Sequence, residues 1–234
     1  MYKRPHHQRI ARILAALDAE LLQAHACLFG GGTCIALRCG EYRESVDMDF
    51  LVADADGYRE LRQLLISKQG LAAITRTGAI PLIPLRELRA DQYGIRTQLQ
   101  IDNAAIKFEI VREARISLEP SGDDDRLCGI ATLSGVDLAA SKLLANADRY
   151  ADDSVFSRDL IDLAMLELTP SHWKRAFEKA EAAYGTAIRR DLDRAIERIR
   201  QQPQWLTRCQ QAMAITLPQA LLWQRIRKLE GAGS

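Results

Sequence analysis

The sequence has no long run of apolar residues, and this absence excludes a protein built on membrane-spanning helices. No apolar stretch among its 234 residues approaches the ~18 residues that such a helix needs. The basic start of the chain is not followed by an uninterrupted apolar segment, so we expect neither a secretory signal nor a membrane partner. Hydrophobic residues nevertheless make up 47% of the chain, which is typical of a folded globular protein rather than a disordered one.

Cysteine is scarce and charge is balanced, and these two features argue against further classes of protein: those held by disulfides or zinc and those with a strongly charged surface. The five cysteines are scattered and none forms a Cys-x-x-Cys pair, so neither a disulfide framework nor a zinc site is indicated. We therefore expect reduced thiols in a cytoplasmic protein. With 32 Lys and Arg against 31 Asp and Glu, the net charge of +1 gives no overall sign of a nucleic-acid partner, although a local basic groove remains compatible with it.

The hydrophobic periodicity predicts an α+β protein without internal repeats, in which a mixed first part precedes a helical second part. In the first part we expect helices over 8–24, 34–39 and 54–69, and strands over 45–52, 70–77, 80–88, 95–101 and 106–111. In the second part we expect helices over 135–151, 157–167, 170–201 and 216–230. The change of composition near Ser134 divides the chain into two predicted domains, 1–133 and 134–234.

The most informative stretch joins a glycine turn to a pair of carboxylates. Gly30-Gly31-Gly32-Thr33 is followed, after a spacer of 13 residues, by Asp47-Met48-Asp49-Phe50. Glycines let backbone N–H groups approach phosphates closely, and the Thr33 hydroxyl adds a donor. Alternate residues of a strand share one face, so Asp47 and Asp49 are placed to hold Mg²⁺ together with phosphate oxygens and water. The pattern favours phosphoryl-transfer chemistry.

Glu109 is our candidate for a third carboxylate of the same site. It lies on the polar face of a predicted strand that follows a hairpin. Three carboxylates suit a pair of metal ions that activate an attacking hydroxyl and stabilise a departing pyrophosphate. The alternative is that Glu109 merely pairs with Lys107 at the surface. No Gly-x-Gly-x-x-Gly or Walker pattern is present, so a Rossmann or P-loop protein is not favoured.

These residues resemble the first motif of the DNA polymerase β-like nucleotidyltransferases and, more narrowly, of the AbiEii/AbiGii toxin family. The family pattern is Gly-Gly-Thr-x-Leu-x-Leu followed by Arg-x-Ser-x-Asp-x-Asp-Phe, and only Ile35 departs from it, at the first Leu. Lys107-Phe108-Glu109 matches the next motif, Lys-x-(Asp/Glu). The two later motifs fall on Lys142 with Arg149 and on the run from Arg158 to Asp162. The resemblance covers most of residues 28–167.

The resemblance implies a fold and a set of roles. The fold is a nucleotidyltransferase-type mixed sheet with flanking helices, followed by a helical C-terminal part. The implied metal ligands, for Mg²⁺ or alternatively Mn²⁺, are Asp47, Asp49 and Glu109, and the implied catalytic residues are these three with Lys142 and Asp159. The implied nucleotide-binding residues are Gly31, Gly32, Thr33, Arg43, Ser45, Lys142 and Arg149. Asp159 also suits a structural role, because the dipole of a helix N-terminus favours any carboxylate.

The resemblance further implies an activity and partners. The activity is the transfer of a nucleoside monophosphate from a nucleoside triphosphate to an acceptor hydroxyl, with tRNA as the expected acceptor and pyrophosphate as the product. The enzyme would be the toxin of a toxin–antitoxin or phage-defence system, so a cognate antitoxin is the expected protein partner. Two alternatives stay open: nucleotidyl transfer to a small molecule such as an antibiotic, and a nucleotide-binding module without turnover. A phosphatase that uses Asp-x-Asp is a further alternative, but it has no use for the upstream glycines.

Overall fold

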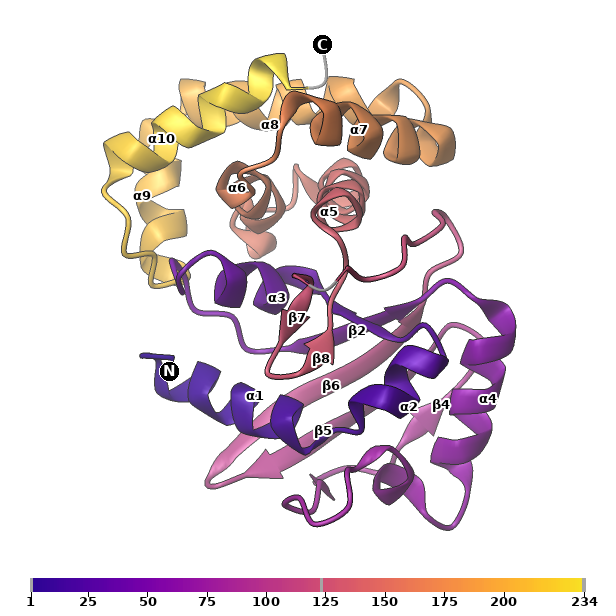
Figure 1. The fold of residues 1–234 in the computed structure, drawn as a ribbon. Helices are drawn as coiled ribbons and strands as arrows, with labels where there is room; N and C mark the ends of the chain where they lie inside the picture. Colours follow the sequence, from indigo (N-terminus) through magenta and orange to yellow (C-terminus); the bar gives the residue numbers. More distant parts are fainter. Residues whose placement is uncertain (1, 123, 233–234) are drawn as a thin grey trace. The chain divides into compact units, whose positions relative to one another are not determined.

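The alternating apolar residues between positions 94 and 112 form the central hairpin of a mixed sheet in this computed structural model, which describes residues 2–122 and 124–232 (Figure 1). Strand β5 (Gly94–Ile101) pairs antiparallel with β6 (Ala104–Arg112), and Asp102 in the turn adopts a left-handed conformation with φ of 52°. Ile106, Phe108 and Ile110 are buried. The predicted hairpin is therefore confirmed, and its apolar face supplies much of the core.

The remaining strands extend this hairpin in both directions. Strand β2 (Met48–Val52) lies parallel to β6, and β1 (Leu28–Gly30) lies antiparallel to β2, so the order is β1-β2-β6-β5-β3. The short strands β3 (Ile83–Pro84) and β4 (Arg89–Ala90) both pair with β5. A separate small sheet joins β7 (Arg126–Leu127) to β8 (Ile130–Ala131). The predicted α+β class with a mixed sheet and flanking helices is confirmed.

Three phenylalanines hold the middle strands together on the buried face. Phe50 of β2 lies between Phe29 of β1 and Phe108 of β6, with ring centroids 5.2 and 5.4 Å apart. The rings are tilted by 46° and 43°, an arrangement that aromatic pairs prefer. The stack lies on one face of β2 and β6, and Asp49 and Glu109 alternate onto the other.

The helices around the sheet differ in part from the prediction. The expected helix over 8–24 is two helices, α1 (Pro5–Ala16) and α2 (Ala19–Ala24), because Leu17 leaves the helical conformation and Asp18 caps α2 through the Leu21 N–H. Helix α4 (Ala55–Ile66) agrees with the expected 54–69. Helix α3 (Gly31–Arg38) follows β1 directly, so the predicted glycine turn is the first turn of a helix.

Two predicted strands were wrong. Residues 70–77 contain the short 3-10 helix η1 (Gly70–Ile74), whose Leu71 and Ile74 are buried. The expected strand over 80–88 is reduced to β3, because Pro81 and Pro84 have no N–H to donate to a neighbouring strand. Three apolar residues of this segment are exposed rather than buried: Ile80, Ile83 (51%) and Leu85.

The second half of the chain is helical, as expected. Helix α5 (Gly135–Arg149) packs against α6 (Arg158–Met165), α7 (Pro170–Tyr184) and α8 (Ala187–Gln201), with the short 3-10 helix η2 (Asp153–Val155) between α5 and α6. The predicted single helix over 170–201 was wrong: Gly185, with φ of 61°, ends α7. Helix α9 (Pro203–Ala212) was not predicted, and α10 (Gln219–Arg227) continues into η3 (Lys228–Gly231).

The chain forms two compact units. Unit 1 contains the residues up to Cys34 together with Ser45–Ser134, and unit 2 contains Ile35–Glu44 together with the residues from Gly135 onward. The segment 35–44 belongs to unit 2 although its sequence lies inside the first predicted domain, 1–133, so the chain passes between the units three times. Among the described residues, no helix combines the length and the apolar character that crossing a bilayer requires.

Candidate active site

Two carboxylates from strands distant in sequence stand next to each other on the sheet of unit 1. Asp49 of β2 is the register partner of Glu109 of β6, and Gly30 of β1 is the partner of Asp49 on the other side. Neighbouring strands lie about 4.8 Å apart, and paired residues point to the same face. Met48 and Phe50 are fully buried on the opposite face. The alternation predicted for β2 therefore directs Asp49 away from the core, beside Glu109; Asp47 immediately precedes the strand.

The glycine at the start of α3 makes room for the Asp49 carboxylate. Gly31 has a φ of 68°, and a Cβ atom built there would lie 2.5 Å from Asp49 Oδ2. Only a residue without a side chain tolerates both the left-handed backbone and this contact. Gly31 and Gly32 form the first turn of α3, where backbone N–H groups lack intrahelical acceptors and favour an anion.

Thr33 ties this turn to the strand that carries the carboxylates. Its side chain is buried, and its hydroxyl donates a hydrogen bond to the carbonyl oxygen of Asp47 and lies 2.8 Å from the Ser45 hydroxyl. The Ser45 N–H in turn donates to His7 Nε2 at 3.2 Å. Both hydroxyls predicted to bind nucleotide thus hold the glycine turn against Asp47; their role toward a nucleotide stays a prediction.

Two cations neutralise Glu109. Lys107 Nζ lies 2.5 Å from Glu109 Oε2, and Arg96 Nε lies 3.1 Å from Oε1. Partial burial lowers the pKa of Lys107, but Glu109, followed by Asp47 and Asp49, outweighs that effect and leaves the pKa raised. The alternative pairing of Glu109 with Lys107 is therefore present in the structure, and the same ammonium lies within the field of both aspartates.

The donor atoms of this cluster fit a hard divalent cation. Asp47, Asp49 and Glu109 offer carboxylate oxygens, the ligands that Mg²⁺ and Mn²⁺ prefer. Within residues 2–122 and 124–232, however, no three His, Cys, Asp or Glu side chains are gathered as a metal cage. Glu109 already pairs with the Lys107 ammonium, within the field of Asp47 and Asp49, so the site suits a cation. Glu109 would have to exchange that partner to bind a metal.

Unit 2 contains a second group of predicted site residues, joined in a buried ionic network. Asp162 of α6 is fully buried and accepts hydrogen bonds from Arg43 Nε at 2.7 Å and Nη2 at 2.9 Å. The Tyr42 hydroxyl donates to the same carboxylate at 2.5 Å. Lys142 Nζ of α5 lies 2.7 Å from Asp162 Oδ2. A two-pronged guanidinium contact of this kind orients both partners strongly.

Asp159 completes this network one turn earlier in α6. It receives Lys142 Nζ at 2.8 Å, and Arg149 donates to it through Nε at 2.7 Å and through Nη2 at 3.0 Å. We call these residues the Lys142 cluster; its members are Tyr42, Arg43, Lys142, Arg149, Asp159 and Asp162. Sequence reasoning missed Tyr42 and the pairing of Arg43, because a partner on α6 leaves no signal near position 43.

The charged groups of the Lys142 cluster stabilise one another in their ionised forms. Burial lowers the pKa of Lys142, but Asp159 and Asp162 outweigh it and raise the pKa. Burial raises the pKa of Asp162, but Arg43 and Lys142 bring it below its usual value. The pKa of Tyr42 is raised well above its usual value, mainly by burial, so the phenol is neutral. The pKa of Arg149 is raised mainly by its hydrogen bond to Asp159, and Asp148, outside the cluster, also contributes.

One buried donor atom lies on the same helix as Lys142. Asn146 follows Lys142 by one turn of α5 and is 2% exposed, and its Nδ2 atom has no hydrogen-bond acceptor among the described residues. Lys142, Asn146 and Arg149 are spaced on one face of the helix.

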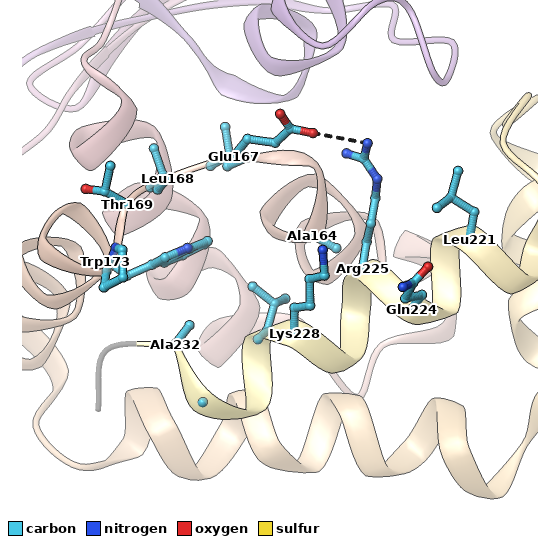
Figure 2. A pocket seen from close by; sticks show the side chains of 14 residues that line it. Ala164, Glu167, Leu168, Thr169, Trp173, Leu221, Gln224, Arg225, Lys228 and Ala232 are labelled. Atoms are coloured by element: carbon cyan, nitrogen blue, oxygen red, sulfur yellow. Dashed lines mark ion pairs between the residues drawn. The ribbon is translucent and has the colours of Figure 1, made fainter.

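A separate pocket of about 680 Å³ in unit 2 contains none of the predicted site residues. Figure 2 shows it between the segment that follows α6 and the helix α10, with the ion pair of Glu167 and Arg225 across one side. Trp173 and Leu221 supply apolar surface. None of the residues that line this pocket belongs to the Lys142 cluster.

Comparisons with known proteins identify the family of this chain and its fold. A family model described as nucleotidyl transferase AbiEii toxin, type IV toxin–antitoxin system, matches residues 12–229. Among solved structures, a candidate nucleotidyltransferase from Helicobacter pylori is similar to the chain, with a TM-score of 0.54 and 15% identity over 97% of this chain and 94% of that one. The protein JHP933 from the same organism has a TM-score of 0.58 and 15% identity, over 100% of this chain and 95% of that one. At this identity the two structures establish the fold alone. No curated protein matches significantly.

Proposed function

Because the chain belongs to the AbiEii family of nucleotidyltransferase toxins, we propose that it transfers a nucleoside monophosphate from a nucleoside triphosphate to a hydroxyl of tRNA in a metal-dependent reaction. Family membership makes the chain a nucleotidyltransferase of a toxin–antitoxin system, and a cognate antitoxin is its expected partner. The metal, the tRNA acceptor and the residue roles are our proposal. The acceptor hydroxyl attacks the α-phosphorus, the bond to the β-phosphate breaks, and pyrophosphate leaves.

One observation carries this proposal: the parallel register that sets Asp49 beside Glu109, with the side-chain-free Gly31 against the Asp49 carboxylate. Asp47 and Asp49 would hold Mg²⁺ or Mn²⁺, joined by Glu109 once Lys107 has released it. The bound metal would supply Lewis-acid stabilisation of the triphosphate and of the departing pyrophosphate. The N–H groups of Gly31 and Gly32 would bind phosphate oxygens; their position in the first turn of α3 supports this role.

The Lys142 cluster contributes charge and order in this proposal. The family resemblance assigns Lys142 to the phosphates, where its compact ammonium would neutralise developing charge. Asp159 is a catalytic candidate, but its contacts with Lys142 and Arg149 support a role in orienting those cations. Arg43 is bound to Asp162, and these contacts support a structural role in which Arg43 fixes the segment that leads to Ser45. This role would add to the nucleotide binding expected of Arg43.

A transfer assay tests this function directly. The protein is incubated with each α-labelled nucleoside triphosphate, Mg²⁺ and total tRNA, and labelled RNA is measured. We expect label in RNA from wild type, none with EDTA in place of the metal, and a loss of at least about 100-fold in the Asp49→Asn variant. The matched control is Asp102→Asn, which removes a carboxylate that pairs with Arg12 at the surface of the same unit and leaves transfer unchanged.

Three outcomes would contradict parts of the proposal. Transfer to an aminoglycoside but not to tRNA would move the acceptor to the small-molecule class. Binding of triphosphate by calorimetry without release of pyrophosphate would favour a module without turnover. Equal transfer by wild type and Asp49→Asn would remove the assigned site.

A further inference from the structure

Unit 1 also contains a pocket, on the face of the sheet opposite to Asp49 and Glu109. This pocket of about 260 Å³ is lined by α4 and by residues near the end of β6: Ala55, Tyr58, Arg59, Arg62, Gln92 and Arg112. The α4 residues are spaced at helical intervals on one face of that helix. Arg112 follows Glu109 by three positions on β6, so the two side chains point to opposite faces. The pocket is therefore distinct from the candidate active site.

The lining of this pocket has positive charge and no acidic residue. Arg59 pairs at 3.0 Å with Asp56, an exposed neighbour on the same helix. Within the part of the chain that the structure describes, neither Arg62 nor Arg112 forms an ion pair. Since guanidinium groups repel one another, three of them around one small pocket are unfavourable without an anion.

A buried donor without an acceptor points the same way. The Nε–H of Arg62 is shielded from solvent and has no hydrogen-bond partner among the described residues. A buried donor left unpaired is costly, so such groups in folded proteins normally meet an acceptor from the protein, from water or from a ligand. Tyr58 does not supply one, because its hydroxyl donates to the carbonyl oxygen of Asp91 at 2.7 Å.

Tyr58, which also lines this pocket, lies in the field of two of its guanidinium groups, Arg62 and Arg112. Burial and then Asp91 raise the pKa of Tyr58, while Arg62, Arg96 and Arg112 act in the opposite direction. Asp91 itself is engaged by Arg96 at 3.1 Å and by the N–H groups of Tyr93 and Gly94, so it does not neutralise Arg62 or Arg112.

We propose that this arginine pocket, formed by Arg59, Arg62 and Arg112 with Gln92, is a binding site for a phosphate group. The planar fork of a guanidinium matches two oxygens of a phosphate, and the Gln92 amide is a further donor type. The volume of about 260 Å³ suits a single phosphate group better than a whole nucleotide, for which pockets of roughly 300–1,000 Å³ are usual. The phosphate belongs either to the backbone of an RNA or to a free phosphate compound. The inference does not depend on the reaction proposed above.

Two binding measurements on the full chain distinguish these sources, both in EDTA so that metal-dependent chemistry does not contribute. The first follows the melting temperature against the concentration of inorganic phosphate at constant ionic strength. The second follows the fluorescence anisotropy of a labelled single-stranded RNA, at several salt concentrations. The variants are Arg62→Gln and Arg112→Gln. The matched control is Arg76→Gln, which removes an equal charge from an exposed arginine of unit 1 outside the pocket.

We expect wild type and Arg76→Gln to be stabilised by phosphate in a saturable manner. Arg62→Gln and Arg112→Gln should need at least about tenfold more phosphate, because each loses a charge-assisted hydrogen bond. If the phosphate belongs to RNA, the same two variants also bind RNA at least about tenfold more weakly, and the salt dependence of binding falls by about one unit of slope for each arginine. A loss confined to inorganic phosphate supports the site and assigns it to a free phosphate compound.

Other results would overturn the site. One is wild type that binds neither ligand, another is variants that bind both ligands as wild type does, and a third is equal losses in Arg76→Gln. Arg112 is exposed, so its variant keeps the test valid if Arg62→Gln fails to fold. Arg62→Lys is the conservative partner: it keeps the charge but removes the Nε donor, and we expect it to bind phosphate more tightly than Arg62→Gln.

Discussion

At the scale of single residues, the candidate active site depends on side chains whose partners are far away in the sequence. Glu109 is held by Lys107 on its own strand and by Arg96 on the next, while Asp162 is held by Arg43 from a position 119 residues earlier. These contacts orient the acidic groups of both units. Single substitutions can therefore distinguish an effect on the orientation of a carboxylate, seen in activity, from an effect on folding, seen in stability.

Gly31 is the position where orientation is most sensitive. In a Gly31→Ala variant the new Cβ would meet Asp49 Oδ2 at 2.5 Å, so the carboxylate has to move. We expect transfer to fall by about 100-fold, since a displacement of about 1 Å at a reacting centre has that effect. The left-handed backbone adds a stability loss of about 1–2 kcal/mol. Transfer rate and melting temperature are the measurements.

Gly78→Ala is the control for this prediction. Gly78 also has a positive φ, of 78°, but a Cβ there meets nothing within 4 Å. It should lose a similar amount of stability and keep its activity. Equal activities of the two alanine variants would show that the Asp49 carboxylate has no role in transfer.

The lowered pKa of Asp162 predicts that the stability of the protein depends on pH. Its pKa is depressed by Arg43 and Lys142 against the effect of burial, so its contribution to stability is present above its unfolded pKa of about 3.9 and is lost as pH falls through the lower folded value. An Asp162→Asn variant leaves two buried cations short of a partner, and we expect a loss of about 3–5 kcal/mol at pH 7. Urea unfolding at pH 7 and pH 3 measures both effects.

In the same experiment the gap between wild type and Asp162→Asn should narrow at pH 3. The control Asp193→Asn, on the exposed side of α8, should stay within about 0.5 kcal/mol of wild type at both values. A gap that does not narrow in acid would mean that the Asp162 charge contributes nothing.

At the scale of elements, the pairing of β2 with β6 decides whether a site exists. A shift of one residue in this register would turn Asp49 or Glu109 toward the core. Phe50 stands in the middle of the aromatic stack that joins β1, β2 and β6, and it is fully buried. The stack therefore couples the core of unit 1 to the alignment of its carboxylates.

A Phe50→Ala variant tests this coupling. We expect a loss of about 3–5 kcal/mol, measured by urea unfolding, because a large cavity opens between three strands. Transfer should also fall, under conditions where the variant is still folded by circular dichroism. Tyr93→Ala is the control, since that ring is 66% exposed and its removal should cost less than about 0.5 kcal/mol. Full activity in a folded Phe50→Ala variant would show that the aromatic stack is not needed to align the carboxylates.

At the scale of the whole molecule, the segment 35–44 makes the two units interdependent. It belongs to unit 2, where Tyr42 and Arg43 bind Asp162, the Tyr42 carbonyl accepts from the Thr216 N–H and the Glu44 N–H donates to Met213. Its ends connect directly to Cys34 and Ser45 of unit 1. A cut at the boundary predicted near Ser134 would therefore leave this segment without its partners.

Truncation tests this dependence. We expect a fragment of residues 1–134 to lack a cooperative thermal transition, because the buried Arg43 would lose the Asp162 carboxylate. Co-expression with residues 135–234 should restore a soluble complex by supplying that partner. A fragment 1–134 that melts cooperatively alone would show that the segment is dispensable, and would favour two independent domains.

Part of this fold could be predicted from local sequence, and the failures have a common cause. Alternation revealed the β5–β6 hairpin, and helical periodicity revealed α4 and α5. It did not reveal the end of α7, because apolar spacing continues through Gly185 into α8, whereas the backbone reverses there. Residues 70–77 have the apolar content of a strand, but residues 70–74 form a 3-10 helix that buries Leu71 and Ile74.

The sequence by itself determined which groups are available and how they face along one element: the glycines at the start of α3, the aspartates on alternate positions, and Glu109 on the polar side of its strand. Only the tertiary structure decided that Asp49 lies beside Glu109, that Lys107 and Arg96 neutralise Glu109, and that Arg43 is bound to Asp162. The reason is physical. Periodicity depends on the backbone geometry of a single segment, while register and ion pairing depend on which distant segment fills the neighbouring space.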